Sequence, residues 1–366
     1  MLYVADLFAG AGGFTEGFRQ AKFKPVVAIE VDRWAAETYA ANFGEHVLAC
    51  PIESIEVLRY RDHLAWIGKD VRGRSVTYET PPIDVLVGGP PCQGFSPLGR
   101  MTDWDRRDPR NKLWRHYVRI LEIVEPKVFV IENVPELLAT SEFAILRRQV
   151  LKLGYEVDSD VLNAAHFGVP QNRKRAIVIG SRVGEPRLPD EVPHRTTVRT
   201  AFKGLPLKPT GKDLHVGRNP LPSSIERYKC IPEGGNRFDL ARKRPDLTAE
   251  CWKRKKTGSV DVFGRMEWDK PSPTIRTEFF KPEKGRYLHP KADRPITMRE
   301  AARLQTFPDA FAFVGSNLQV AKQIGNAVPV LLAKIIGAHI KVSLLGKRKK
   351  SVRKTAARSE DVALYA

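Results

Sequence analysis

Cysteine and long apolar runs are both scarce in this chain of 366 residues. Its four cysteines are Cys50, Cys92, Cys230 and Cys251, and they show none of the paired short spacings of a zinc site or a disulfide framework. Their scarcity predicts an intracellular chain with free thiols and no metal site. No apolar stretch reaches the length of a membrane span, and no signal peptide precedes the first expected strand. We therefore expect no membrane association.

Positive charge is what the chain has in excess. It carries 61 lysine and arginine residues against 42 aspartate and glutamate residues, a formal net charge of +19. A hydrophobic content of 42% fits a globular core, and the length is enough for two domains. The charge favours a polyanion as partner, although a merely soluble basic surface would give the same composition.

The stretch GGPPCQGFS at 88–96 is the centre of the sequence. It follows a short apolar run at 83–87 that predicts a buried strand. Two glycines end that strand, two prolines stiffen the backbone, and Cys92 comes next. A rigid backbone that aims one thiol at a strand end suits a nucleophile. A structural buried cysteine is the alternative that a lone thiol would favour.

The chain opens with the pattern of a βαβ unit. Strands are predicted at 2–8 and 25–30, and helices at 14–21 and 33–42. A tight glycine turn connects the first strand to the first helix. Such a turn lets a ligand approach the backbone, and Glu30 at the end of the second strand can accept hydrogen bonds from ribose hydroxyls. The spacing differs from the dinucleotide fingerprint, so a nucleoside without a pyrophosphate is the better interpretation.

Two later motifs carry charged side chains at strand ends. The apolar run at 128–133 predicts a buried strand that ends in Glu132. If that strand lies beside the one before Cys92, both side chains can reach one substrate ring, because neighbouring strands are about 4.8 Å apart. The run QNRKR at 171–175 places two arginines on one face of an extended chain, where they suit a phosphate or a polar base edge. A solvated charged strand entry is the alternative.

The second half of the chain changes character. Prolines and glycines become frequent over 183–290, basic residues outnumber acidic ones, and aromatic residues are interleaved. We interpret this stretch as a small domain of short strands and loops with a nucleic-acid-facing surface, or as a lid. A capping box, Thr297 to Glu300, predicts a short helix. A mostly apolar helix after Asn326 is expected to pack back on the first sheet.

In this order, these motifs resemble those of the DNA (cytosine-5) methyltransferases over about residues 2–340. The matching segments are DLFAGAGG at 6–13, Glu30, PCQ at 91–93, ENV at 132–134, QNRKR at 171–175, residues 294–305 and GNAV at 325–328. The basic stretch lies where this family keeps its target recognition domain. One departure concerns the third strand, after which the family usually places an acid that meets the adenine amino group. Here 48–52 lacks one, and Glu53 follows.

The resemblance implies an α/β fold with a doubly wound, mixed, mostly parallel Rossmann-like sheet and a second, smaller target recognition domain. The catalytic and cofactor-binding domain would span 1–182 and the target recognition domain 183–290. A return segment at 291–345 would complete the catalytic domain, and 346–366 would be a basic, disordered tail.

The resemblance also implies the reaction, which is methyl transfer from S-adenosylmethionine to C5 of a cytosine flipped out of duplex DNA. Cys92 would be the nucleophile, Glu132 would hold the base, and Arg173 and Arg175 would contact the base or its flanking phosphate. The implied cofactor-binding residues are Phe8, Ala9, Gly10, Gly12, Gly13, Phe14, Glu30, Val31, Pro91, Asn326 and Ala327. The implied DNA-binding residues are Gln93, Ser96 and Gln171, and the loop at 93–111 would close over the base.

The expected partners are double-stranded DNA and a cognate restriction endonuclease, for a monomer that acts on the nucleoid in the cytoplasm. Two alternatives stay open. The same chemistry on transfer RNA is known from one eukaryotic branch with these motifs, and a catalytically silent DNA-binding relative would share the fold. The recognition sequence would depend on loop conformations in the variable stretch.

Overall fold

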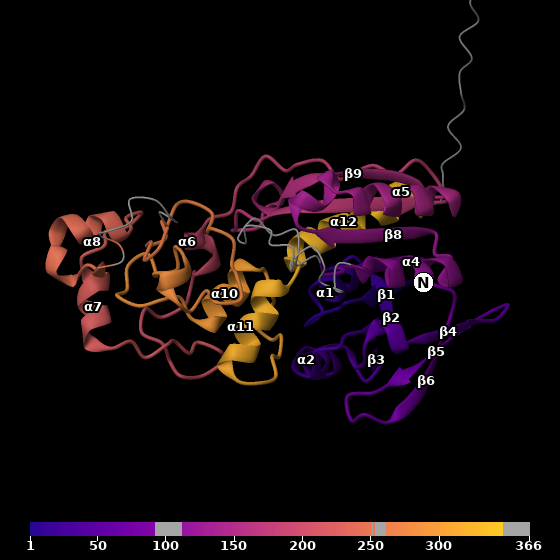
Figure 1. Cartoon of the computed structure of the whole chain (residues 1–366), viewed down its shortest axis with the longest axis horizontal. Helices are drawn as coiled ribbons and strands as arrows, with labels where there is room; N and C mark the ends of the chain where they lie inside the picture. The colour runs from indigo at the N-terminus through magenta and orange to yellow at the C-terminus, as the bar shows by residue number, and fades with distance from the viewer. Residues whose placement is uncertain (92–111, 251, 253–260, 347–366) are drawn as a thin grey trace, which may run out of the picture.

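A seven-stranded sheet forms the core of the computed structural model, which describes residues 1–91, 112–250, 252 and 261–346 (Figure 1). Its strand order is β3-β2-β1-β7-β8-β10-β9. The strands are β1 (Leu2–Leu7), β2 (Phe23–Ile29), β3 (Val47–Leu48), β7 (Val85–Gly88), β8 (Val128–Asn133), β9 (Glu156–Asn163) and β10 (Lys174–Ser181). Neighbours from β3 to β8 are parallel, and β10 runs antiparallel to both β8 and β9. The predicted mixed, mostly parallel fold is confirmed.

Helices cover both faces of this sheet. On one face lie α1 (Gly13–Gln20) and α12 (Val330–Ser343), whose side chains share a core with β1 and β8. On the other lie α4 (Trp114–Val124) and α5 (Ser141–Lys152). The strands are apolar on both sides because both faces are covered, as in β8, where all six residues are buried. The helix α2 (Arg33–Phe43) connects β2 to β3.

A second, antiparallel sheet follows β3, and the sequence had not predicted it. It consists of β4 (Glu56–Arg59), β5 (Leu64–Lys69) and β6 (Ser75–Thr80) in that order. Its inner face is anchored by Trp66, which is fully buried and donates its indole N–H to Thr80 Oγ1 at 3.1 Å. The helix α4 was missed as well, although its buried positions recur with helical spacing.

The stretch at 183–290 forms a lobe at the far end of the molecule (Figure 1). Its helices are α6 (Val198–Ala201), α7 (Pro222–Lys229) and α8 (Arg237–Lys243), and its 3₁₀ turns are η6 (Pro245–Leu247) and η7 (Pro282–Lys284). The expectation of short strands is wrong for the residues described here, which contribute only isolated bridges. Among the described residues of the sheet domain, further 3₁₀ turns are η1 (Ile52–Ser54), η4 (Pro135–Ala139) and η5 (Ala164–Phe167).

The return segment divides between the two parts. The helices α10 (Met298–Leu304) and α11 (Asn317–Asn326) share a core with lobe residues such as Phe202 and Phe279, whereas α12 packs on the sheet as predicted. By length and composition, Asn317–Ser343 could cross a membrane, but 67% of its apolar window is buried inside the fold. Burial of that extent is typical of a core helix.

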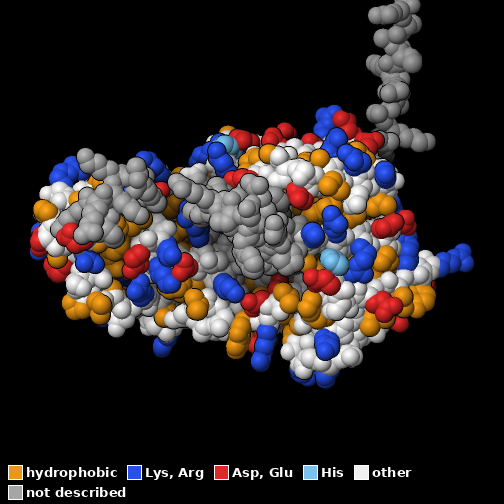
Figure 2. Space-filling view, in the orientation of Figure 1, with side chains coloured by type: hydrophobic (Ala, Val, Ile, Leu, Met, Phe, Trp, Pro, Cys, Tyr) orange, Lys and Arg blue, Asp and Glu red, His pale blue; other side chains and the backbone are white. Residues whose placement is uncertain are grey.

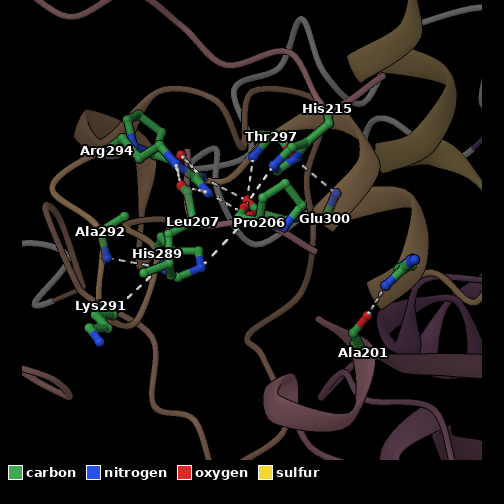
Figure 3. A network of polar contacts seen from close by, with 12 residues as sticks. Ala201, Pro206, Leu207, His215, His289, Lys291, Ala292, Arg294, Thr297 and Glu300 are labelled. Carbon is green, nitrogen blue, oxygen red and sulfur yellow. Dashed lines mark hydrogen bonds and ion pairs between the residues drawn. The ribbon is translucent and has the colours of Figure 1, made fainter. Parts of the chain in front are cut away.

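A buried polar network fastens the lobe to α10 (Figure 3). Glu300 is fully buried and accepts two hydrogen bonds from Arg294, at 2.8 and 2.7 Å, and the same guanidinium donates to the carbonyl of Leu207. The predicted capping box is confirmed, since Thr297 Oγ1 and the Glu300 carboxylate each accept the other residue's backbone N–H. His215 bridges Thr297 Oγ1 and the carbonyl of Pro206.

The excess positive charge is not gathered into a single field on the face in Figure 2. Lysine and arginine side chains lie scattered there over both parts of the molecule, with aspartate and glutamate side chains among them. The position of any DNA contact therefore has to come from local geometry rather than from the net charge alone.

Candidate active site at the carboxyl edge of the sheet

The predicted motifs meet at one edge because β1, β2, β7 and β8 are parallel and end side by side. The strand β7 pairs with β8 from Val85↔Val128 to Gly88↔Ile131. The chain that leads to Cys92 therefore leaves the sheet next to Glu132, as the sequence predicted. Cys92, Gln93 and Ser96 themselves lie outside the described residues, as does the predicted closing loop.

The turn after β1 requires its glycines for steric reasons. Gly12 has φ 95°, and a Cβ there would lie 2.4 Å from the ring of Phe43. A Cβ on Gly13 would lie 2.5 Å from the carbonyl oxygen of Val328, so α1 and the approach to α12 touch through backbone. Gly10 has φ 55°, and its Cβ position meets no atom within 4 Å. The turn is thus tightly packed at Gly12 and Gly13 and open at Gly10.

Glu30 joins this turn to the end of β2. Its Oε2 accepts the backbone N–H of Gly10 at 2.7 Å, and its Oε1 accepts that of Asp32 at 2.7 Å. Burial raises the pKa of the Glu30 carboxyl, and the backbone hydrogen bonds oppose that rise. Each carboxylate oxygen keeps a second lone pair for a hydroxyl. Val31 follows with a 64% exposed side chain, and Asp32 caps α2.

Asp6, at the end of β1, is a buried acid that the sequence did not single out. Its side chain is 2% exposed and accepts a hydrogen bond from Thr15 Oγ1 at 2.7 Å through Oδ2. Its Oδ1 is buried and has no hydrogen-bond partner among the described residues. Burial raises the pKa of Asp6 to about 7. An acid directly before the glycine turn is the signal that could have identified it.

Glu132 and Arg175 form the ion pair of the site. Arg175 Nε lies 2.9 Å from Glu132 Oε1, and the two side chains are only 18% and 10% exposed. The antiparallel register brings them together, since Ile177 faces Glu132 across the strands. A Cβ on Gly89 would lie 3.4 Å from the other carboxylate oxygen, so the backbone that precedes Cys92 passes directly beside Glu132.

Asn133 fixes the path of that backbone. Its Nδ2 donates to the carbonyl of Pro90 at 2.8 Å, and its Oδ1 accepts the N–H of Val134 at 2.8 Å. Pro91, the last residue described before the gap, is half-buried. The hydrogen bond to Asn133 therefore ties Pro90 to the end of β8.

Gln171 and Arg173 do not lie at the sheet edge, where the sequence predicted contacts with the DNA and the base. Gln171 has no exposed surface, and its amide donates to the carbonyl of Leu304 and to Gln305. Arg173 is 2% exposed, donates to two backbone carbonyls through Nη1, and has its pKa lowered to about 9, first by burial and then by Arg175. Of the three alternating residues, only Arg175 reaches the site in this geometry. The other two tie its strand to the lobe.

The predicted residues after α11 reach the glycine turn through backbone. Asn326 is exposed at the end of α11, and Ala327 is almost buried. Gln305 Nε2 holds this turn by donating to the carbonyls of Ile324 and Ala327, at 2.6 and 3.2 Å. The side chain of Phe14 lies in the core shared by α1, α12 and the sheet, so a cofactor could meet this residue only through its backbone.

These residues fit a nucleoside with a cationic group. The open space at Gly10 and the Glu30 carboxylate suit a ribose, and the unpartnered oxygen of Asp6 suits a buried ammonium hydrogen bond. Among the described residues, no three histidine, cysteine, aspartate or glutamate side chains gather as a metal site.

Comparison with known proteins gives one consistent result. The family model for C-5 cytosine-specific DNA methylase matches residues 2–342. The Type II methyltransferase M1.HphI of Haemophilus parahaemolyticus is 35% identical over 344 residues, covering 92% of this chain and 85% of its own. The Type II methyltransferase M.XorII of Xanthomonas oryzae is 34% identical and covers 94% and 86%.

Solved structures agree on the fold. A DNA modification methyltransferase encoded within a prophage of E. coli is 26% identical with a TM-score of 0.65, covering 94% of this chain and 99% of its own. The methyltransferase EhMeth of Entamoeba histolytica is 17% identical with a TM-score of 0.62, covering 93% and 98%. At that identity the second likeness concerns the fold alone.

Proposed function

We propose that the sheet edge described above is the active site of this chain, which belongs to the C-5 cytosine-specific DNA methylase family. The chain is a DNA (cytosine-5-)-methyltransferase, and the reaction of its family passes through a covalent cysteine adduct. The observation that carries the assignment is the Glu132–Arg175 pair at 2.9 Å, set against the backbone that leads to Cys92. Since its relatives are Type II methyltransferases, a cognate restriction endonuclease is the proposed functional partner.

In this mechanism the Cys92 thiolate adds to C6 of a cytosine flipped out of the duplex. Glu132 holds N3 and the exocyclic amine, and it supplies the proton that offsets the negative charge of the adduct. Arg175 orients Glu132 and lies where the base or its phosphate would come. Once C5 carries the methyl group, a base removes the C5 proton and the thiolate leaves.

S-adenosylmethionine would supply the methyl group at this edge. The turn from Phe8 to Gly13 and Glu30 would hold its nucleoside, and Asn326 would close the site from α11. Asp6 would accept a hydrogen bond from the ammonium group, which its unpartnered Oδ1 allows. Glu53 is exposed just after β3, so the adenine amino group has no buried acid there among the described residues.

The test is a methyl-transfer assay with labelled S-adenosylmethionine on duplex DNA and, in parallel, on total RNA. We expect label at cytosine C5 in DNA and none in RNA. Cys92→Ser should abolish transfer while DNA and cofactor binding persist, because a hydroxyl is a much weaker nucleophile than a thiolate. Transfer to RNA alone, or near wild-type transfer by the serine variant, would overturn the proposal.

A further inference from the structure

A hollow of about 450 Å³ lies between the approach to β10 and the lobe, outside the edge described above. Asn172 lines it from the sheet side, and all the other lining residues, from Asp261 to Tyr287, belong to the lobe. The backbone N–H of Asn172 donates to the carbonyl of Ser272 at 2.8 Å, and Thr274 Oγ1 donates to the carbonyl of Asn172 at 2.7 Å. The hollow is thus attached directly to the strand that carries Arg175.

Four lysine and arginine side chains line this hollow, and three of them are paired with carboxylates. The pairs are Lys270–Glu267 at 2.8 Å, Lys284–Glu278 at 3.3 Å and Arg286–Asp261 at 3.1 Å. Arg286 also donates to the carbonyls of Gly234, Gly235 and Arg265, so its donors are largely occupied. The fourth cation is Arg276. Its exposed guanidinium makes no hydrogen bond or ion pair with any residue that the structure describes.

The backbone under Arg276 is fixed on both sides. The N–H of Ile275 donates to Gln171 Oε1 at 2.8 Å, and its carbonyl accepts a hydrogen bond from Arg173 at 3.2 Å. A Cβ on Gly325 would lie 2.5 Å from the carbonyl carbon of Arg276, so only a glycine lets α11 approach this segment. The two buried motif residues that do not reach the active site therefore hold the one unpaired guanidinium of the hollow.

We propose that Arg276 is a specificity-determining residue that donates two hydrogen bonds to O6 and N7 of a guanine in the recognition sequence. The inference rests on the proposed function, since it requires a DNA substrate. Carboxylates compensate every other cation of the hollow, so among the described residues Arg276 has no second unpaired positive charge beside it that would strengthen the binding of a phosphate anion. A guanine edge is neutral and presents two acceptors, which matches one unpaired guanidinium among compensated charges. Attachment to the approach to β10 places the guanine close to the flipped cytosine.

The experiment compares the wild-type protein with Arg276→Ala on a library of duplexes with random sequence, followed by sequencing of the methylated cytosines. We expect the wild type to require guanine at one position. The variant should lower that preference on the order of 10- to 100-fold and leave the other positions unchanged. Arg148→Ala is the matched control, because it removes an exposed arginine from α5 on the sheet domain. It should leave the profile as it is.

A base analogue separates base contact from phosphate contact. A duplex with 7-deazaguanine at that position lacks the N7 acceptor, so the wild type should lose methylation efficiency while Arg276→Ala loses nothing further. If Arg276 instead contacts a phosphate, the variant weakens binding equally on all sequences and lowers the salt slope by about one. That result would overturn the proposal.

The two failures can be distinguished. If the wild-type protein methylates no duplex DNA, the proposed function is wrong and this inference is wrong with it. A wild type that methylates a specific cytosine, with a profile that Arg276→Ala leaves unchanged, removes only the inference. The recognition sequence could also contain no guanine except the one paired with the target cytosine. If Arg276→Ala leaves the base preference at that pair unchanged, this result also removes only the inference. Thermal unfolding and S-adenosylmethionine binding of the variant should match wild type, because Arg276 is exposed.

Discussion

Glu132 combines two demands at the scale of a single residue. In the proposed mechanism it must be buried enough to hold a base edge without competition from water. It must also keep a charged partner, because a buried unpaired carboxylate would destabilise the fold. Arg175 Nε at 2.9 Å supplies that partner, and both side chains stay largely covered. Removing one member of such a pair leaves a desolvated charge, which costs more than the pair itself contributes.

Glu132→Gln is therefore a sharper variant than removal of either side chain. The amide keeps the size and shape of the carboxylate and can present an oxygen to Arg175, so the fold should persist. It cannot supply the proton that offsets the charge of the adduct, so kcat should fall by about 10²–10⁴. Glu122→Gln, which changes an exposed carboxylate on α4, is the control and should be silent. A Glu132→Gln enzyme within tenfold of wild type would contradict the role assigned to this residue.

Glu30 permits a second prediction at this scale. Glu30→Ala removes a carboxylate that holds the N–H groups of Gly10 and Asp32 and would accept ribose hydroxyls. S-adenosylmethionine affinity should weaken by about 1–3 kcal/mol, the range for hydrogen bonds to a charged acceptor. Titration calorimetry measures this change. Glu53→Ala removes the exposed acid after β3 and should leave affinity unchanged. Equal affinities of the Glu30→Ala and wild-type proteins would remove Glu30 from the site.

At the scale of elements, the strands of the main sheet could be predicted from the sequence. The side-chain contacts between elements distant in the sequence could not. The runs at 2–8, 25–30 and 128–133 are apolar on both faces and bounded by turn residues, so local pattern was enough. Arg173 shows why local sequence pattern was not enough for such contacts. Its partners, Ile275 and Gly325, are 102 and 152 residues away, so its sequence neighbours gave no sign of its burial. Its position in an extended motif suggested exposure, and tertiary packing overrode that.

The antiparallel sheet β4–β6 was missed for a different reason. Its strands are four to six residues long, and the outer strands alternate only weakly between buried and exposed positions. Such short segments resemble loops in a sequence. The helix α4 could have been found, because Trp114, Tyr117, Val118, Leu121 and Val124 are spaced for one buried helix face.

The network that fastens the lobe to α10 makes a prediction about pH. His289 Nδ1 accepts the N–H groups of Lys291 and Ala292, and its Nε2 faces Glu300 at 3.7 Å. Burial lowers the pKa of His289 to about 4. Between pH 6.5 and about 4 the unfolded chain binds a proton that the folded chain does not. Stability contributed by this histidine is therefore complete above pH 6.5 and is lost as pH falls toward 4.

The loss should amount to about 3 kcal/mol over that range, since each pKa unit corresponds to about 1.4 kcal/mol. Urea unfolding of the wild type and of His289→Gln at pH values from 4.5 to 7.5 measures it. The difference between the two proteins should shrink as the pH falls, because the glutamine does not titrate. Asp6 changes the stability in the opposite direction, because its raised pKa makes stability fall as the pH rises. This contribution is present in both proteins and cancels in their difference. Parallel curves would contradict the prediction, because they would show that the pKa of His289 is the same in the folded and the unfolded chain.

At the scale of the whole molecule, the proposed mechanism draws all its groups from one chain. The glycine turn, Glu30, the Glu132–Arg175 pair and the backbone before Cys92 all lie at one edge of one sheet. The apolar helix α12 could be mistaken for a dimer element. It is instead buried against α1, where a Cβ on Gly17 would lie 2.4 Å from that of Ala333. We therefore expect the proposed site to be completed without a second subunit.

Trapping of the covalent adduct tests this arrangement. A duplex with 5-fluorocytosine at the target cannot lose its C5 substituent as a proton, so the adduct should persist when S-adenosylmethionine is present. Mass measurement should show one chain of 41.2 kDa on each target strand, and peptide mapping should place the adduct at Cys92. Cys92→Ser should form no adduct.

The other thiols that the structure describes give the outcome that would contradict it. Cys50 is 6% exposed, and its Sγ accepts the backbone N–H of Lys69 at 3.4 Å, so no base can reach it without local unfolding. Cys230 lies in the lobe at the end of α7, far along the chain from the sheet edge, and its Sγ donates to the carbonyl of Glu226. An adduct at either cysteine, or two chains for each trapped base, would mean that the reacting groups are not assembled at the carboxyl edge of one sheet.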